Sequence, residues 1–85
     1  MKTAKEMFEE LGYHIETNKF NLFYKRENDS LTIIFYLKEK YVRIVEEHYI
    51  GELGLYEYLG IDYPITVELH KAIHQQMKEL GWLDE

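Results

Sequence analysis

Apolar residues recur every three or four positions near both ends of the chain, and this spacing predicts two terminal helices. The first is expected over residues 4–11, where Thr3 and Glu6 form a capping-box pattern at its start. The second is expected between Thr66, a suitable N-cap, and Gly81, a suitable helix-terminating glycine.

Four runs between these helices alternate in period two or are rich in β-branched and aromatic residues, which predicts strands. They cover residues 13–16, 20–25, 31–37 and 41–45. Because only short turns separate them, an antiparallel meander is expected. In the third run one face is apolar (Leu31, Ile33, Phe35, Leu37) and should meet the helices, while the opposite face of this run and the next is mixed and is expected to be partly wet.

Residues 48–64 contain three glycines and the only proline, and no single period runs through them. We expect an irregular segment here, with a short strand over 55–58 as one alternative. An irregular segment of this length is uncommon in a compact domain and often carries function.

These elements predict one small α+β domain over residues 1–85, in the order α-β-β-β-β-α. A four-stranded antiparallel meander would carry the N- and C-terminal helices on one face. The expected core consists of Met7, Phe8, Leu11, Ile15, Leu22, Ile33, Phe35, Val42, Ile44, Leu69, Ile73, Met77, Leu80 and Trp82.

Composition narrows the class of protein. The 85 residues include no cysteine, which excludes disulfides, thiol nucleophiles and Cys-based zinc sites. The longest unbroken apolar run, residues 33–37, is far shorter than the roughly 20 residues that a membrane span needs. No targeting segment is recognised, so a cytoplasmic protein is expected.

The net charge is −6, and this negative value argues against direct nucleic-acid binding. The charge is also distributed unevenly along the chain. Residues 1–43 carry eight Lys/Arg and seven Asp/Glu, a balance of +1, whereas residues 44–85 carry two and nine, a balance of −7. No basic residue lies between Arg43 and Lys71.

His70 and His74 are four positions apart on the second predicted helix, so both rings can approach one metal ion. A zinc site needs three or four ligands, and the sequence HKAIH lacks the glutamate of a metallohydrolase motif. The helical wheel places both rings at the apolar–polar boundary, where histidines commonly pack. They are weak metal candidates, and no cofactor is predicted.

No catalytic motif is present. The glycines at 51 and 54 lack the Lys-Ser/Thr pair of a phosphate-binding loop, and Ser30 is the only serine. Glu46 and Glu47 are adjacent, and neighbours on a strand point to opposite faces, so they cannot share a proton. A non-enzymatic protein is therefore expected.

Tyrosines and carboxylates are interleaved over residues 46–63, and we call this set the acidic-aromatic arc. Tyrosine is enriched at protein interfaces, although it is also a common half-buried residue. The arc is therefore either a partner-binding surface or a soluble cover for the core. Its members are Glu46, Glu47, Tyr49, Glu52, Tyr56, Glu57, Tyr58, Asp62 and Tyr63.

The segments TAKEMFEELGY (residues 3–13) and ELHKAIHQQMKELGW (residues 68–82) resemble the ends of small hypothetical proteins encoded by phages and prophages of low-GC Gram-positive bacteria. Such proteins have a variable, β-rich middle. The resemblance implies an accessory phage gene product in a bacterial cytoplasm. It carries over no functional residue, because the shared motifs are only helix starts and stops.

The leading hypothesis is a small protein that binds a protein partner, of basic charge in its sharpest version, through the acidic-aromatic arc. That version is an inhibitor whose carboxylates imitate nucleic-acid phosphates, and it requires the acids to project in a row. Two alternatives are a self-associating structural protein, such as a homodimer paired through an edge strand or the mixed sheet face, and a metal-binding domain that uses His70 and His74.

Overall fold

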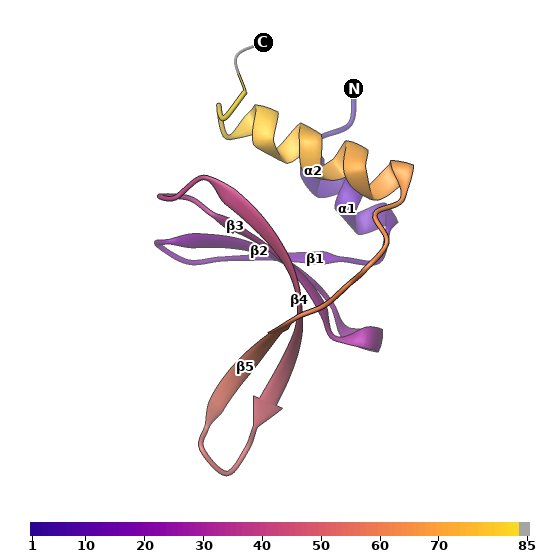
Figure 1. Cartoon of the computed structure of the whole chain (residues 1–85). Helices are drawn as coiled ribbons and strands as arrows, with labels where there is room; N and C mark the ends of the chain where they lie inside the picture. The colour runs from indigo at the N-terminus through magenta and orange to yellow at the C-terminus, as the bar shows by residue number, and fades with distance from the viewer. Residues whose placement is uncertain (84–85) are drawn as a thin grey trace.

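A computed structural model describes residues 1–83 of the chain (Figure 1). Two helices and five strands are joined in the order α1, β1, β2, β3, β4, β5, α2, with a short 3₁₀ turn between β2 and β3. Their bounds are α1 Ala4–Glu10, β1 His14–Thr17, β2 Asn21–Arg26, the 3₁₀ turn Glu27–Asp29, β3 Leu31–Tyr36, β4 Tyr41–Ile50, β5 Leu55–Gly60 and α2 Val67–Glu79.

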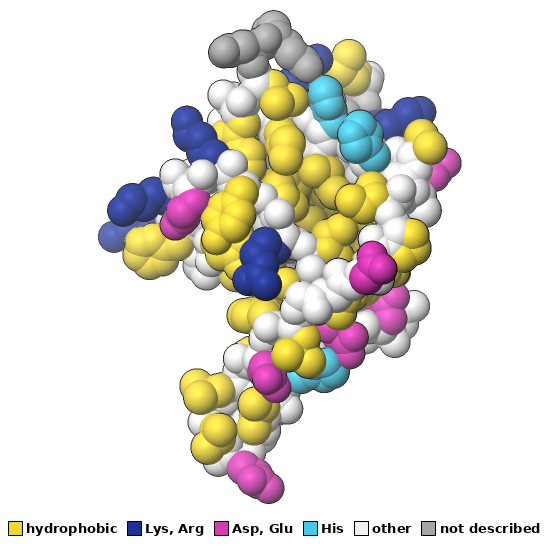
Figure 2. Space-filling view, viewed as in Figure 1, with side chains coloured by type: hydrophobic (Ala, Val, Ile, Leu, Met, Phe, Trp, Pro, Cys, Tyr) yellow, Lys and Arg dark blue, Asp and Glu magenta, His cyan; other side chains and the backbone are white. Residues whose placement is uncertain are grey.

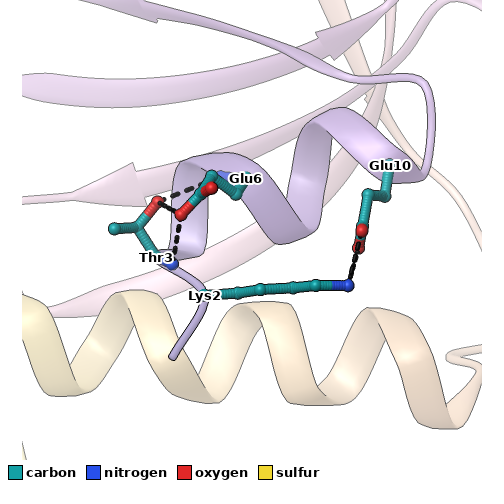
Figure 3. Close-up of polar contacts among 4 residues, drawn as sticks. All are labelled: Lys2, Thr3, Glu6 and Glu10. Atoms are coloured by element: carbon teal, nitrogen blue, oxygen red, sulfur yellow. Dashed lines mark hydrogen bonds and ion pairs between the residues drawn. The ribbon is translucent and has the colours of Figure 1, made fainter.

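The predicted capping box begins α1 (Figure 3). The Glu6 amide donates to Thr3 Oγ1 at 3.2 Å, and the Thr3 amide donates to Glu6 Oε1 at 2.9 Å, so two otherwise unpaired amides are satisfied. Lys2 reaches along the helix and donates to the Glu10 carboxylate. These contacts define the start of a helix only seven residues long.

Both helices end in a Schellman motif. The Tyr13 amide donates to the Phe8 carbonyl at 3.0 Å and the Trp82 amide donates to the Met77 carbonyl at 2.9 Å. The glycine that precedes each donor has positive φ, +90° at Gly12 and +74° at Gly81, a conformation that a Cβ atom disfavours. The two predicted helix ends are therefore confirmed.

The sheet is an antiparallel meander in the order β1-β2-β3-β4-β5, so the prediction of four strands was wrong. β4 does not end at Val45 but continues to Ile50, and residues 55–60 pair with it as a fifth strand. Tyrosine and isoleucine favour the pleated backbone here, and Gly54, with φ +64°, closes the turn. Most of the segment expected to be irregular is thus a hairpin.

The helices pack against each other, and the core lies between them and one face of the sheet (Figure 1). Phe8 of α1 stacks on Tyr24 of β2, with ring centroids 3.8 Å apart, and both rings meet Phe35 edge-on. The Tyr24 hydroxyl donates to Gln76 Oε1 of α2 at 2.5 Å, which satisfies a buried amide. Burial raises the pKa of this phenol to about 12.

The predicted core is confirmed, since all fourteen residues lie in the core cluster or pack against it. The cluster has four further buried members: Leu31, which was expected to meet the helices, and Tyr13, Tyr24 and Ala72, which were not in the expected core.

The opposite sheet face, which we call the outer face, is buried at its centre and exposed toward one end. Thr32, Ile34 and Val45 are each 1% exposed or less, although Tyr41 and Arg43 on the same face are exposed. In the register, residues with long side chains flank these three: Lys25 is opposite Thr32, and Phe23 and Arg43 are opposite Ile34. These neighbours cover the centre, while Tyr41 and Arg43 remain exposed, so the face is partly wet, as predicted.

Replacing Phe8 with alanine should lower the free energy of unfolding by about 3–5 kcal/mol, because it removes a fully buried ring and leaves a cavity. Phe20→Ala is the matched control, since Phe20 is 65% exposed and its loss should cost about 0.5 kcal/mol or less. Urea unfolding followed by circular dichroism measures both. Equal losses would contradict this description of the core.

Acid should abolish the contribution of the Glu6 cap to the free energy of unfolding. Its hydrogen bond from the Thr3 backbone lowers the pKa of Glu6 below 4.5, so the ionised carboxylate stabilises the folded state above that value. This contribution is lost as pH falls through the folded-state pKa. The stability difference between the wild type and Glu6→Gln should therefore shrink to near zero in acid. A difference that is independent of pH in urea titrations would refute this role.

Candidate protein-binding surface

The distal part of the β4–β5 hairpin, residues 46–59, extends beyond the rest of the sheet, and we call it the arm (Figure 1). The pairing of β3 with β4 ends at Leu31 opposite Glu46, and the Glu47 amide makes one further bond, 2.9 Å, to the Ser30 carbonyl. Within residues 1–83, the strand pairing of β4 past this point is to β5 alone. The arm is therefore a two-stranded ribbon with no helix packed on it.

The register sorts the arm into two faces. Residues opposite each other on an antiparallel pair share a face. The outer face of the arm carries Glu47 opposite Tyr58 and Tyr49 opposite Tyr56, and the Tyr49 and Tyr56 ring centroids are 5.1 Å apart. The other face carries the pairs Glu46–Leu59, His48–Glu57 and Ile50–Leu55.

Large apolar side chains are concentrated on the arm. Among residues 1–83 eleven large hydrophobic residues are exposed, and six of them belong to this hairpin, with exposed fractions between 39% and 66%. Figure 2 shows hydrophobic side chains along the arm, at the bottom of the view, with acidic side chains beside them. The tyrosines lie on the outer face, Leu55 and Leu59 on the other face and Leu53 in the turn, so both faces of the arm expose apolar surface, a feature that marks interaction sites. The six are Tyr49, Leu53, Leu55, Tyr56, Tyr58 and Leu59.

Lys25 of β2 anchors the base of the arm on the outer face. Its Nζ lies 3.1 Å from Glu47 Oε2 and 3.5 Å from Glu16 Oε1, and 5.6 Å from the centre of the Tyr56 ring. Burial lowers the pKa of Lys25, but the hydrogen bond to Glu47 and the charges of Glu47 and Glu16 outweigh it, so the pKa is raised. One arc carboxylate is thereby neutralised within the chain.

An open hollow of about 380 Å³ lies where the arm leaves the sheet. His14, Lys25, Glu47 and Tyr56 are among its lining residues, so its charges alternate in sign. Tyr49 is also among the lining residues, so two aromatic rings of the arm border the hollow. The hollow thus combines hydrogen-bond donors and ring edges.

The acidic-aromatic arc does not form one surface. Glu47, Tyr49, Tyr56 and Tyr58 share the outer face, Glu46 and Glu57 point the other way, and Glu52 lies in the turn at the tip. Asp62 is exposed beyond β5.

Tyr63 has a different setting from the rest of the arc. Its hydroxyl accepts from Arg26 Nη2 at 2.8 Å, and Arg26 also pairs with Asp29 at 2.7 Å. The bond from Arg26 lowers the pKa of Asp29. Tyr63 packs against the core cluster, so it holds the β5–α2 connection to the sheet.

His70 and His74 lie on the exposed side of α2, with ring centroids 6.3 Å apart. No group of three or more metal-ligating side chains is found among residues 1–83.

Sequence reasoning missed Lys25, Glu16, Leu53, Leu55 and Leu59 as members of this surface. The tyrosines of LYEYLG, residues 55–60, were the signal for a strand, and the alternative of a short strand over 55–58 is confirmed by β5. Lys25 on β2 contacts Glu47 on β4, with β3 between them. A pattern within a short stretch of sequence cannot predict such a contact.

The Lys25–Glu47 pair should show energetic coupling. Lys25→Met leaves a carboxylate that is only 14% exposed without its ammonium partner, so the free energy of unfolding should fall by about 2–3 kcal/mol. Glu47→Gln, which removes the charge at constant size, should restore at least about 1 kcal/mol when combined with Lys25→Met. A double-mutant cycle in urea measures the coupling, and strictly additive losses would show that the pair is unimportant.

No helix of residues 1–83 is both long enough and apolar enough to cross a membrane. No protein-family model, curated protein or solved structure matches the chain. We therefore argue function from the surface of the chain itself.

Proposed function

We propose that this chain is a non-enzymatic protein-binding protein and that the arm is its binding element. The observation that carries the proposal is the exposure of six large apolar residues on a ribbon that neither helix covers. The proposal uses the part of the acidic-aromatic arc that lies on the hairpin and leaves Tyr63 with its structural contact to Arg26.

The limited stability of the ribbon gives a physical reason for binding. A lone two-stranded hairpin is only marginally stable in water, and here its outer edge, β5, offers unpaired backbone groups and exposed leucines and tyrosines. Burying one such side chain contributes about 1.5–3 kcal/mol. A partner that covers several of them gains affinity from surface that the folded monomer leaves in water.

Charge selects the kind of partner. The arm carries Glu46, Glu47, Glu52 and Glu57, and no lysine or arginine lies between Arg43 and Lys71. Since complementary potentials raise association rates, a basic surface with apolar pockets suits the arm best.

The nucleic-acid-mimicking version is less well supported than binding through aromatic contacts. It needs carboxylates in a row, whereas Glu47 faces Lys25 and Glu46 and Glu57 lie on the opposite face. A mimic would lose binding steeply as salt rises, because exposed charges are screened beyond about 8–10 Å at physiological ionic strength. Binding dominated by the tyrosines would persist.

The resemblance of the terminal segments to phage and prophage proteins supplies a context for this proposal. A partner would then be a host or phage protein in a Gram-positive cytoplasm. We rank a metal-binding role for His70 and His74 lower, because no third ligand accompanies them among residues 1–83.

A capture experiment with matched variants tests the proposal. The tagged chain, a Tyr49→Ser/Tyr56→Ser variant of the arm, and a Tyr41→Ser control from the far end of β4 would be incubated with Gram-positive lysate at low and moderate salt. Captured proteins would be quantified by mass spectrometry. We expect a basic partner that the wild type and Tyr41→Ser retain and the arm variant loses by tenfold or more. Equal capture by all three would refute the arm as the binding element.

A further inference from the structure

The end of the sheet opposite the arm has the reverse charge and its own exposed aromatic side chains. We call it the basic end: the β1–β2 turn with Lys19 and Phe20, and the β3–β4 turn with Lys38, Lys40 and Tyr41. The two turns are neighbours, since the Leu37 amide donates to the Phe20 carbonyl at 3.1 Å. Phe20 is 65% exposed and Tyr41 is 47% exposed.

The basic end has a positive balance. Its three lysines are exposed, and Glu39 is the one acid in the two turns. In Figure 2 dark-blue side chains gather at the left, where Figure 1 places these turns, and acidic side chains lie toward the arm. The molecule thus has an acidic end and a basic end, and exposed aromatic rings lie at both.

One molecule cannot bring these two surfaces together. β4 begins at Tyr41 in the basic end and finishes at Ile50 in the arm. Nine residue steps of an extended strand span about 30 Å, and the longest dimension of the molecule is 46 Å. Any contact between arm and basic end must therefore join two copies.

We propose that the arm of one copy docks on the basic end of a second copy, so that the chain assembles head to tail. This inference rests on the proposed function, since it names a partner for the same arm. In the contact, Glu52 at the tip of the arm would face Lys19, Lys38 and Lys40, and the outer-face tyrosines Tyr49 and Tyr56 would cover Phe20 and Tyr41. Glu57 lies on the opposite face of the arm and would add to the attraction through its charge alone. Aromatic residues at the centre with charges around them are the usual arrangement of a specific interface.

Charge argues against the symmetric alternative, in which two arms pair through their β5 edges. If the two-fold axis passed through the Glu57 position, the Glu57 carboxylates of the two copies would lie opposite each other. If it passed through the Tyr58 position, the glutamates of both arms would still lie close together. Like charges placed opposite each other destabilise strand pairs. The head-to-tail contact instead joins opposite charges.

A head-to-tail contact uses two different patches, so each copy retains a free arm and a free basic end unless a ring closes. Assembly should therefore grow beyond dimers as concentration rises. It should weaken as salt rises, because the charges are exposed and screened.

Charge reversal with mixing tests the inference. Variant A carries Glu52→Lys and Glu57→Lys in the arm, and variant B carries Lys19→Glu, Lys38→Glu and Lys40→Glu in the basic end. Sedimentation velocity and light scattering would measure mass for the wild type, A, B and their equimolar mixture at several concentrations and salt levels. Circular dichroism would check folding, which these exposed positions should not disturb.

We expect the wild type to reach at least twice the monomer mass at high concentration, and A and B each to remain monomeric. The mixture should regain the wild-type mass, since each arm then meets an end of opposite charge. Assembly of B alone would favour arm-to-arm pairing and overturn the inference.

A wild type that stays monomeric at every concentration and salt level would also overturn it, without any variant. If the arm-dependent capture of another protein persisted in that case, the proposed function would stand and only the self-assembly would fail. Assembly that Tyr49→Ser/Tyr56→Ser leaves unchanged would contradict both.

Discussion

The stacking of Phe8 on Tyr24 is the contact on which the rest of the structure depends. The two rings, 3.8 Å apart, join the first helix to the second strand, and the hydroxyl of Tyr24 reaches Gln76 on the last helix. One residue thus links three elements that are distant in sequence. Because the phenol is buried, its hydrogen bond must be satisfied, and this fixes where α2 lies over the sheet.

That arrangement also limits how much of the sheet the helices cover. α1 has seven residues and α2 has thirteen, and both terminate in glycine-containing caps. At 1.5 Å per residue, α2 extends only about 20 Å, which is shorter than the ten-residue strand β4. The hairpin formed by β4 and β5 therefore extends past the helices and leaves its apolar side chains exposed.

The outer face shows how the arm is held without helices. The Lys25 ammonium lies between Glu16 and Glu47, and the Tyr56 ring is close to the same ammonium. Arg26, next in sequence, points to the other side of β2 and holds Tyr63 and Asp29. Consecutive residues of one strand thus orient the arm and the β5–α2 connection separately.

The sequence by itself determined both helices, their caps, the first four strands except the end of β4, and all fourteen core residues named from it. These features depend on local spacing, capping chemistry and alternation, which the chain carries within short windows. It offered the fifth strand only as an alternative over residues 55–58, because the glycines at 51, 54 and 60 and the irregularly spaced acids interrupt the period. Only the tertiary structure decided that Lys25 neutralises Glu47, that the arc divides between two faces, and that the acidic arm and the basic end are too far apart to meet. Register across strands and the reach of a helix are long-range properties, and no local pattern encodes them.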